Sequence, residues 1–177
     1  MRLFITGMKH CGKSTASRIL AGLTGLEGSD SDDLVLAYLG TDSIRQWYRE
    51  HGKEAFMDAE LKAVSAFMDS HKSYILSLGG GVCDNGPLMD RMKKEGRIIY
   101  LTRPEEAVLG KIMQKGLPPF IDPADPEGSF HRLYTRRDRI YRSYADLTVE
   151  LGPYGDKEEC ARRILSRLEE AQWLETQ

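Results

Sequence analysis

Residues 7–14 are the part of the chain whose types and spacing most clearly suggest chemistry. They read GMKHCGKS and match the phosphate-binding loop pattern G-x-x-x-x-G-K-[ST] at every fixed position. Gly7 and Gly12 let the backbone curl until successive N–H groups surround phosphate oxygens. Lys13 would reach the β- and γ-phosphates of a nucleotide, and the Ser14 hydroxyl would bind Mg²⁺. A plain glycine turn with a solvated lysine needs neither the paired glycines nor the Lys-Ser sequence, so the pattern predicts nucleotide binding.

The loop and the start of the helix expected after it supply the predicted nucleotide contacts. These contacts are Gly7, Cys11, Gly12, Lys13, Ser14 and Thr15. The neighbours His10 and Cys11 could also suggest a metal site, but no second pair of ligands follows at usable spacing. We therefore interpret these two residues as bystanders with respect to metal chemistry.

Two acidic residues, Asp30 and Asp32, form the next candidate group. They follow Lys13 after one predicted helix and a short extended piece. In an extended segment both carboxylates would point to one side, where one could assist Mg²⁺ and the other could orient a hydroxyl group. A solvated acidic turn that caps a following helix is the alternative interpretation.

A glycine triplet at Gly79, Gly80 and Gly81 follows the apolar stretch 74–78, which reads as a buried strand. Such a triplet lets a ligand approach the carboxyl end of a strand closely, where open α/β sheets place their sites; a flexible turn is the alternative. The stretch does not end in the acid expected of an ATP-driven motor or transporter domain. The chain also has no N-K-x-D guanine motif, which argues against a GTPase.

Buried strands that alternate with helices must position these residues. The predicted strands are 2–6, a short piece around 26–28, 74–78, 97–101 and a segment near 147–151. The predicted helices are 14–23, one capped by Asp42 or Ser43 that runs to residue 50, 53–71, one with Pro104 as its first residue, about 129–144, and 156–173. This alternation is typical of a parallel sheet with helices on both faces. Residues 116–128 hold four of the seven prolines and predict a long loop that could act as a lid.

The composition bounds the class of protein. A length of 177 residues suits a single domain, and the net charge of −2 argues against a sequence-independent nucleic-acid binder. No apolar run approaches the roughly 20 residues that span a bilayer, and we find no signal peptide. Three cysteines without metal-ligand spacing suit a reducing compartment. We therefore expect one cytoplasmic domain, 1–177, with neither nucleic-acid nor membrane partners.

Together these features resemble the shikimate kinase family. The resemblance covers nearly the whole chain: the phosphate loop, Asp-Ser-Asp at 30–32, GKEAFMDAE at 52–60, the triple glycine, the proline-bearing lid, and RDRIY at 137–141 before Ala145 and Asp146. It implies a three-layer α/β/α P-loop kinase fold whose five-stranded parallel sheet has the order 2-3-1-4-5. It also implies a monomer that transfers the γ-phosphate of ATP to a hydroxyl of shikimate.

The resemblance assigns roles to particular residues. Asp30 would assist Mg²⁺ through water, Asp32 would bind and orient the acceptor hydroxyls, and Lys13 would stabilise charge on the transferring group. An acceptor-binding segment would span about 31–60 and a lid about 111–128. The residues expected at the acceptor are Asp32, Met57, Gly79, Gly80, Gly81 and Arg137, the last of these at the shikimate carboxylate.

Two positions depart from the family pattern. Phe56 and Met57 stand where the family has Phe-Arg, and methionine cannot donate the charged hydrogen bond that the arginine normally makes to the substrate carboxylate. In the lid, LPPF at 117–120 stands where the family has Arg-Pro-Leu-Leu. Lys111 or Lys115 could supply the missing charge over the nucleotide, as a point cation and not a planar fork; a solvated helix face is the alternative.

We therefore expect an ATP- and Mg²⁺-dependent kinase of shikimate or a close analogue. A kinase for a different polyol or sugar acid such as gluconate is the alternative, since Met57 removes part of the carboxylate clamp. A nucleotide-binding regulatory module without catalysis is a third reading, and the intact set of Lys13, Ser14, Asp30 and Asp32 argues against it.

Overall fold

Five parallel strands form the centre of the protein in a computed structural model that describes residues 1–118 and 120–174. Pro119 of the expected lid and residues 175–177 lie outside the described residues. The strands are β1 (Arg2–Thr6), β2 (Glu27–Asp30), β3 (Tyr74–Ser77), β4 (Arg97–Thr102) and β5 (Leu147–Glu150). Their order in the sheet is β2-β3-β1-β4-β5, which confirms the predicted α/β architecture and strand order.

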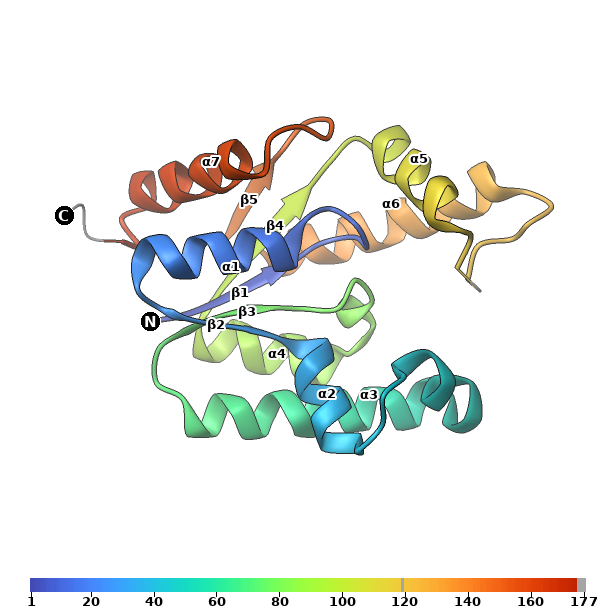
Figure 1. Cartoon of the computed structure of the whole chain (residues 1–177), viewed down its shortest axis with the longest axis horizontal. Helices are drawn as coiled ribbons and strands as arrows, with labels where there is room; N and C mark the ends of the chain where they lie inside the picture. Colours follow the sequence, from blue (N-terminus) through green and yellow to red (C-terminus); the bar gives the residue numbers. More distant parts are fainter. Residues whose placement is uncertain (119, 175–177) are drawn as a thin grey trace.

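Helices lie on both faces of this sheet (Figure 1). They are α1 (Lys13–Thr24), α2 (Ser31–Leu39), α3 (Ile44–Ser70), α4 (Gly86–Glu95), α5 (Glu105–Lys115), α6 (Pro126–Tyr144) and α7 (Lys157–Glu170), with a short 3₁₀ turn η1 (Val82–Asp84). Side chains of β1 alternate between two cores, because successive residues of a strand point to opposite faces. Leu3 and Ile5 pack with α1 and α7, whereas Phe4 packs with α3, α4, α5 and α6.

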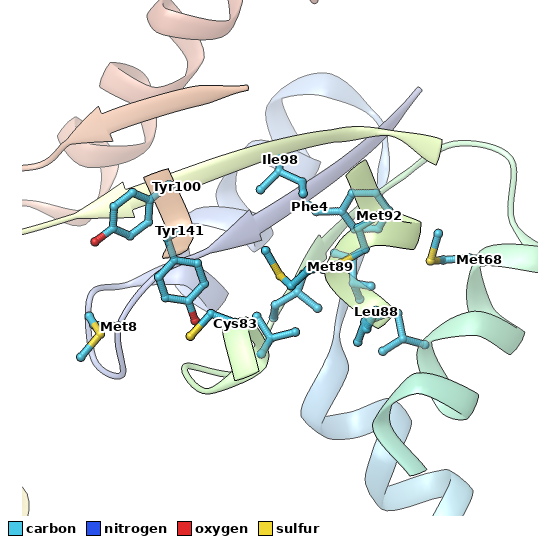
Figure 2. Packing of buried hydrophobic residues seen from close by; sticks show 14 of the residues in the cluster. Phe4, Met8, Met68, Cys83, Leu88, Met89, Met92, Ile98, Tyr100 and Tyr141 are labelled. Atoms are coloured by element: carbon cyan, nitrogen blue, oxygen red, sulfur yellow. The ribbon is translucent and has the colours of Figure 1, made fainter. Parts of the chain in front are cut away.

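The second of these cores is rich in methionine and tyrosine (Figure 2). Tyr100 of β4 and Tyr141 of α6 stack with ring centroids 5.1 Å apart, and both side chains are fully buried. Met8, which belongs to the phosphate loop, is buried in the same cluster. The loop is therefore held to the hydrophobic interior by one of its own side chains.

Parallel pairing brings the carboxyl ends of β1, β2 and β3 to one edge of the sheet. Ser77 of β3 pairs with Ile5 of β1 on one side and with Asp30 of β2 on the other. The segments that follow these strands are the phosphate loop, Asp-Ser-Asp and the glycine triplet. The strand register alone therefore places the three predicted site segments side by side.

Several element boundaries differ from those expected from sequence. Helix α2 begins at Ser31, directly after β2, and α4 with its preceding turn was not predicted. The predicted helices on either side of Gly52 form one element, α3, interrupted at Gly52, which has φ 85° and ψ 178°. The expected lid loop is shorter at its end, because Pro126 begins α6 and the Asp125 side chain accepts a hydrogen bond from the Gly128 N–H.

The ends of other helices follow the sequence signals only in part. Ser43, not Asp42, caps α3 by accepting from the Gln46 N–H, and Gly25 ends α1 in a left-handed conformation with φ 71°. Pro104 is the cap before α5 and not its first residue. In the described residues no helix is long and apolar enough to cross a membrane.

Candidate active site at the carboxyl ends of the strands

The phosphate loop connects β1 to α1 in the geometry that its glycines allow. Gly7 and Gly12 adopt φ angles of 149° and 101°, which side chains strongly disfavour. A Cβ on Gly7 would also collide with the carbonyl oxygen of Leu101. Gly12 caps α1 and, among the described residues, no side chain caps this helix. The first-turn N–H groups of α1 are thus left for an anionic ligand.

Lys13 and Cys11 stabilise the loop through hydrogen bonds to the Met8 carbonyl oxygen. The Lys13 Nζ donates to the carbonyl oxygen of Met8 at 2.9 Å, and the side chain is 8% exposed. Cys11 is fully buried in the core, and its N–H donates to the same Met8 carbonyl at 3.2 Å. Thr15 is half-buried in the first turn of α1. Contact of Cys11 and Thr15 with a nucleotide stays a prediction.

Four lysines lie in or near the loop: Lys9 and Lys13 belong to it, and Lys111 and Lys115 belong to α5. Burial is the largest cause that lowers the pKa of His10, and the positive charges of Lys9, Lys115, Lys13 and Lys111 lower it further. Both predicted lid lysines therefore act electrostatically on the phosphate loop. Lys111 also lies over the ring of Tyr154, with its Nζ 5.4 Å from the ring centroid. The concentration of positive charge favours a polyphosphate at this point.

Ser14, Asp30 and Ser77 bring three oxygen atoms together beside the loop. The Ser14 hydroxyl donates to Asp30 Oδ2 at 2.6 Å and lies 3.3 Å from the Ser77 hydroxyl. Hydroxyl and carboxylate oxygens are the hard ligands that Mg²⁺ takes, and it commonly uses one or two protein ligands with phosphate and water. The donor set therefore fits a nucleotide-bound Mg²⁺. The described residues contain no cluster of three or more His, Cys, Asp or Glu side chains that would hold a metal without such a ligand.

The expectation that Asp30 and Asp32 share one side of an extended segment is wrong, because α2 begins between them. Asp30 is the cap of α2, and its Oδ1 accepts from the Asp32 N–H at 3.0 Å. Asp32 lies in the first helical turn and turns toward the glycine triplet. Ser31, between the two acids, is fully buried and accepts from the Gly79 N–H at 3.0 Å. Ser31 is not among the site residues predicted from the sequence.

Each glycine of the triplet lies against a different functional segment. A Cβ on Gly79 would lie 3.1 Å from Asp32 Oδ1, and one on Gly81 would lie 3.4 Å from Arg137 Nη2. A Cβ on Gly80 would lie 2.7 Å from the backbone nitrogen of Lys9 in the phosphate loop. The triplet thus lets the loop, Asp32 and Arg137 approach one another closely, which favours the ligand-binding interpretation over a flexible turn.

Arg137 is held at this triplet from α6. Its Nη1 donates to the Gly80 carbonyl oxygen at 3.0 Å, and the Tyr141 hydroxyl donates to the same oxygen at 3.0 Å. The Arg137 side chain is buried, and its Nε has no hydrogen-bond partner among the described residues. Phe120 of the lid segment lies over the guanidinium, 5.5 Å from Cζ to the ring centroid.

Glu60 is a buried acid at the site that sequence analysis left without a role. It is 4% exposed, and its Oε2 accepts from the Asn85 amide at 2.9 Å; the same amide donates to the Met57 carbonyl oxygen at 2.9 Å. Its position on the face of α3 that also buries Val64 and Phe67 was a signal available in the sequence. Met57 itself is half-buried.

Arg103 is a second organising residue that the sequence did not single out. It is buried and donates to the carbonyl oxygens of Cys11 at 3.0 Å, Gly152 at 3.0 Å and Pro153 at 2.8 Å. Its guanidinium also lies 4.7 Å from the ring centroid of Tyr154. Arg103 therefore joins the phosphate loop to the segment between β5 and α7.

Gly80→Ala tests the close approach of the triplet to the phosphate loop. The added methyl group would press on the Lys9 backbone, which cannot rotate away, so we expect the free energy of unfolding to fall by about 1–3 kcal/mol and nucleotide affinity to weaken. Urea unfolding and ATP titration measure the two effects. Gly110→Ala is the control, because this exposed position of α5 has open space around its Cβ. Equal behaviour of both variants would refute the predicted packing constraint.

Glu60 predicts a pH dependence of stability. Burial, helped by the charges of Asp32 and Asp84 and opposed by the Asn85 hydrogen bond, raises the pKa of Glu60 from 4.5 to about 7. Between these values the folded protein holds a proton that the unfolded chain has lost, so stability decreases as pH rises from 4.5 to 7 and then levels off. The contribution is about 3 kcal/mol. Urea unfolding between pH 4.5 and 8 should show this slope in the wild type and a flatter one in Glu60→Gln. An equal pH dependence of the free energy of unfolding in both proteins would contradict this role of Glu60.

Three comparisons with known proteins identify the family of this chain. A family model described as shikimate kinase matches residues 9–169. The shikimate kinase of Halorhodospira halophila is 33% identical over 168 residues, which cover 95% of this chain and 93% of that protein. The structure of shikimate kinase from Acinetobacter baumannii in complex with shikimate superposes with a TM-score of 0.86 at 27% identity, covering 97% of this chain and 94% of that one. The Aquifex aeolicus enzyme superposes with a TM-score of 0.82 at 26% identity, covering 97% and 98%. The chain therefore belongs to the shikimate kinase family of ATP-dependent phosphotransferases.

Proposed function

We propose that this protein transfers the γ-phosphate of ATP to a hydroxyl group of shikimate or of a closely related hydroxylated acid. The observation that carries the proposal is the convergence of the phosphate loop, Asp32 and Arg137 on three successive glycines. In this arrangement a phosphate site, a hydroxyl-binding carboxylate and a carboxylate-binding cation would lie side by side. The structural relative from Acinetobacter baumannii, which is in complex with shikimate, supports the choice of acceptor.

The nucleotide would lie over the phosphate loop, with its phosphates at the backbone N–H groups of the first turn of α1. The phosphate-binding surface would be formed by residues of the loop and the first turn of the helix, namely Gly7, Cys11, Gly12, Ser14 and Thr15. Lys13 would move from the Met8 carbonyl to the phosphates and neutralise charge on the transferring group. Lys111 and Lys115 would add positive charge from α5.

Ser14 and Asp30 would hold Mg²⁺, because their oxygen atoms lie 2.6 Å apart at the edge of the loop. When bound, the ion supplies charge neutralisation at the phosphate oxygens. Asp30 is fixed in place by its role as the cap of α2, where it accepts from the Asp32 N–H. The same short segment therefore serves both the metal and the acceptor.

Asp32 would orient the attacking hydroxyl, and Arg137 would hold the acceptor carboxylate. Burial raises the pKa of Asp32, with the charge of Asp30 acting in the same direction, so its carboxylate accepts a hydroxyl proton more readily than a solvated aspartate would. Gly79, Gly80 and Gly81 would form the wall of the pocket. The acceptor-binding segment would span about 31–60 and include Met57, and the lid about 111–128 would exclude water.

A kinase of another sugar acid such as gluconate is the second candidate, and Met57 favours it. No arginine is present at this position to pair with the shikimate carboxylate, so the acceptor is held by a different set of charges. We also propose that the protein works as a monomer in the cytoplasm. Its three cysteines are free, which suits a reducing compartment, and the mass in solution tests the oligomeric state.

A panel of acceptors tests the proposal. ADP release is measured with shikimate, quinate and gluconate, and saturable turnover is expected with shikimate. Lys13→Ala should lower that turnover by at least about a hundredfold with an unchanged melting temperature, because charge stabilisation is lost while the fold is kept. Saturable turnover with gluconate and none with shikimate would establish the second candidate. Tight ATP binding without transfer to any acceptor would favour the non-catalytic module.

A further inference from the structure

Three cationic side chains converge on a single carboxylate beside the glycine triplet. Asp84 of η1 has Arg136 Nη1 at 2.7 Å from its Oδ1, with Lys53 Nζ at 3.3 Å and Arg137 Nη2 at 3.7 Å from its Oδ2. Within the described part of the chain, none of these three cations has another carboxylate within 4.0 Å. One negative charge therefore faces three positive charges, and the excess positive charge of the cluster favours the binding of a second anion.

The fold holds Lys53 and Asp84 together from two directions. Gly52, with φ 85°, interrupts α3, so that Lys53 begins the second half of that helix. Asn85, next to Asp84 in the chain, donates to the Met57 carbonyl oxygen at 2.9 Å and to Glu60 at 2.9 Å. The carboxylate of Asp84 is thus anchored against the helix that carries Lys53. This anchoring keeps Asp84 within ion-pair distance of Lys53.

The unbalanced charge lies at the acceptor pocket. Arg137 is 92% buried, since its relative exposure is 8%, and its Nε has no hydrogen-bond partner in the described residues. The same guanidinium borders the position of a Cβ on Gly81 at 3.4 Å. The Lys53 side chain is 53% exposed, so its flexible stem is free to move from Asp84 to a bound ligand.

We propose that Lys53 binds the carboxylate of the acceptor together with Arg137 and thereby determines specificity for an acidic acceptor. Asp84 acts as the positioning counter-ion that holds both cations while the pocket is empty. Lys53 lies one helical turn before Met57, on the same face of α3. It therefore supplies a positive charge to the face of the helix where the family pattern has an arginine and this chain has the uncharged Met57. The inference rests on the proposed function, because it assumes that the acceptor occupies the pocket beside Arg137.

The experiment compares substrates and variants in steady-state kinetics of the full-length protein. Lys53→Met should raise the KM for shikimate about tenfold, because one charge-assisted hydrogen bond at a half-exposed site is lost. The kcat and the KM for ATP should stay within about twofold of the wild-type values. Lys53→Met should not change the KM for the methyl ester of shikimate, because the ester has no charge for Lys53 to bind. If the ester is not phosphorylated, its inhibition constant is measured in place of its KM. Lys53→Arg should keep most of the affinity for shikimate.

Lys62→Met is the matched control for the loss of one positive charge from the same helix. Lys62 is 56% exposed and pairs with Asp58 at 2.6 Å, on α3 but outside the cluster. This variant should keep the wild-type KM for shikimate. Melting temperatures of all variants separate a binding effect from a loss of folded protein.

An unchanged KM for shikimate in Lys53→Met would overturn the inference while leaving the proposed function intact. An equal rise in Lys62→Met, or an equal loss for shikimate and its methyl ester, would also overturn it, because the effect would then be general or structural. If the ester does not bind at all, Lys53→Arg decides the outcome. A tenfold loss of shikimate affinity in Lys53→Met that Lys53→Arg does not restore would overturn the inference. If the wild-type protein phosphorylates no carboxylic acid, the proposed function fails and this inference fails with it.

Discussion

The close approach of Gly80 to the backbone of Lys9 is the constraint on which the site depends. The position of a Cβ on Gly80 lies only 2.7 Å from the Lys9 nitrogen, so the loop after β3 and the phosphate loop after β1 touch through backbone alone. The Gly80 carbonyl oxygen then accepts from Arg137 and Tyr141, which ties α6 to the same point. One glycine therefore sets how closely the glycine triplet approaches the phosphate loop. A side chain at this position would push the two segments apart.

Positive charge gathers in two regions of the site, and an acidic side chain separates them. The lysines around His10 form the region that suits a polyphosphate, and the cations around Asp84 form the region that suits an acceptor carboxylate. Asp32 lies between these regions, where burial raises its pKa. This local arrangement explains how a chain with a net charge of −2 can bind two anionic ligands. The charges act where desolvation and the short distances of the pocket make them strong.

The fold class, the strand order and most elements could be predicted, because each depends on local signals or on the family resemblance. The pattern of 7–14 predicted the loop geometry, and Gly25 marked the end of α1. The relation of Asp30 to Asp32 was predicted wrongly, because α2 begins at Ser31 and turns the second carboxylate toward Gly79. The roles of Ser31, Glu60 and Arg103 were missed. Each of these side chains acts through a backbone or side-chain partner at least 25 residues away, and composition and periodicity carry no record of such a partner.

The sequence by itself determined that the chain forms a parallel α/β sheet with a phosphate-binding loop, because glycine positions and apolar periodicity act over a few residues. It also determined that a methionine, Met57, stands where the family pattern has an arginine. Only the tertiary structure decided what surrounds that position. Lys53, Arg136 and Arg137 come from α3 and α6, far apart in the chain, and meet at Asp84 because Asn85 anchors η1 to α3. Charge interactions depend on distance in space, and folding alone sets that distance.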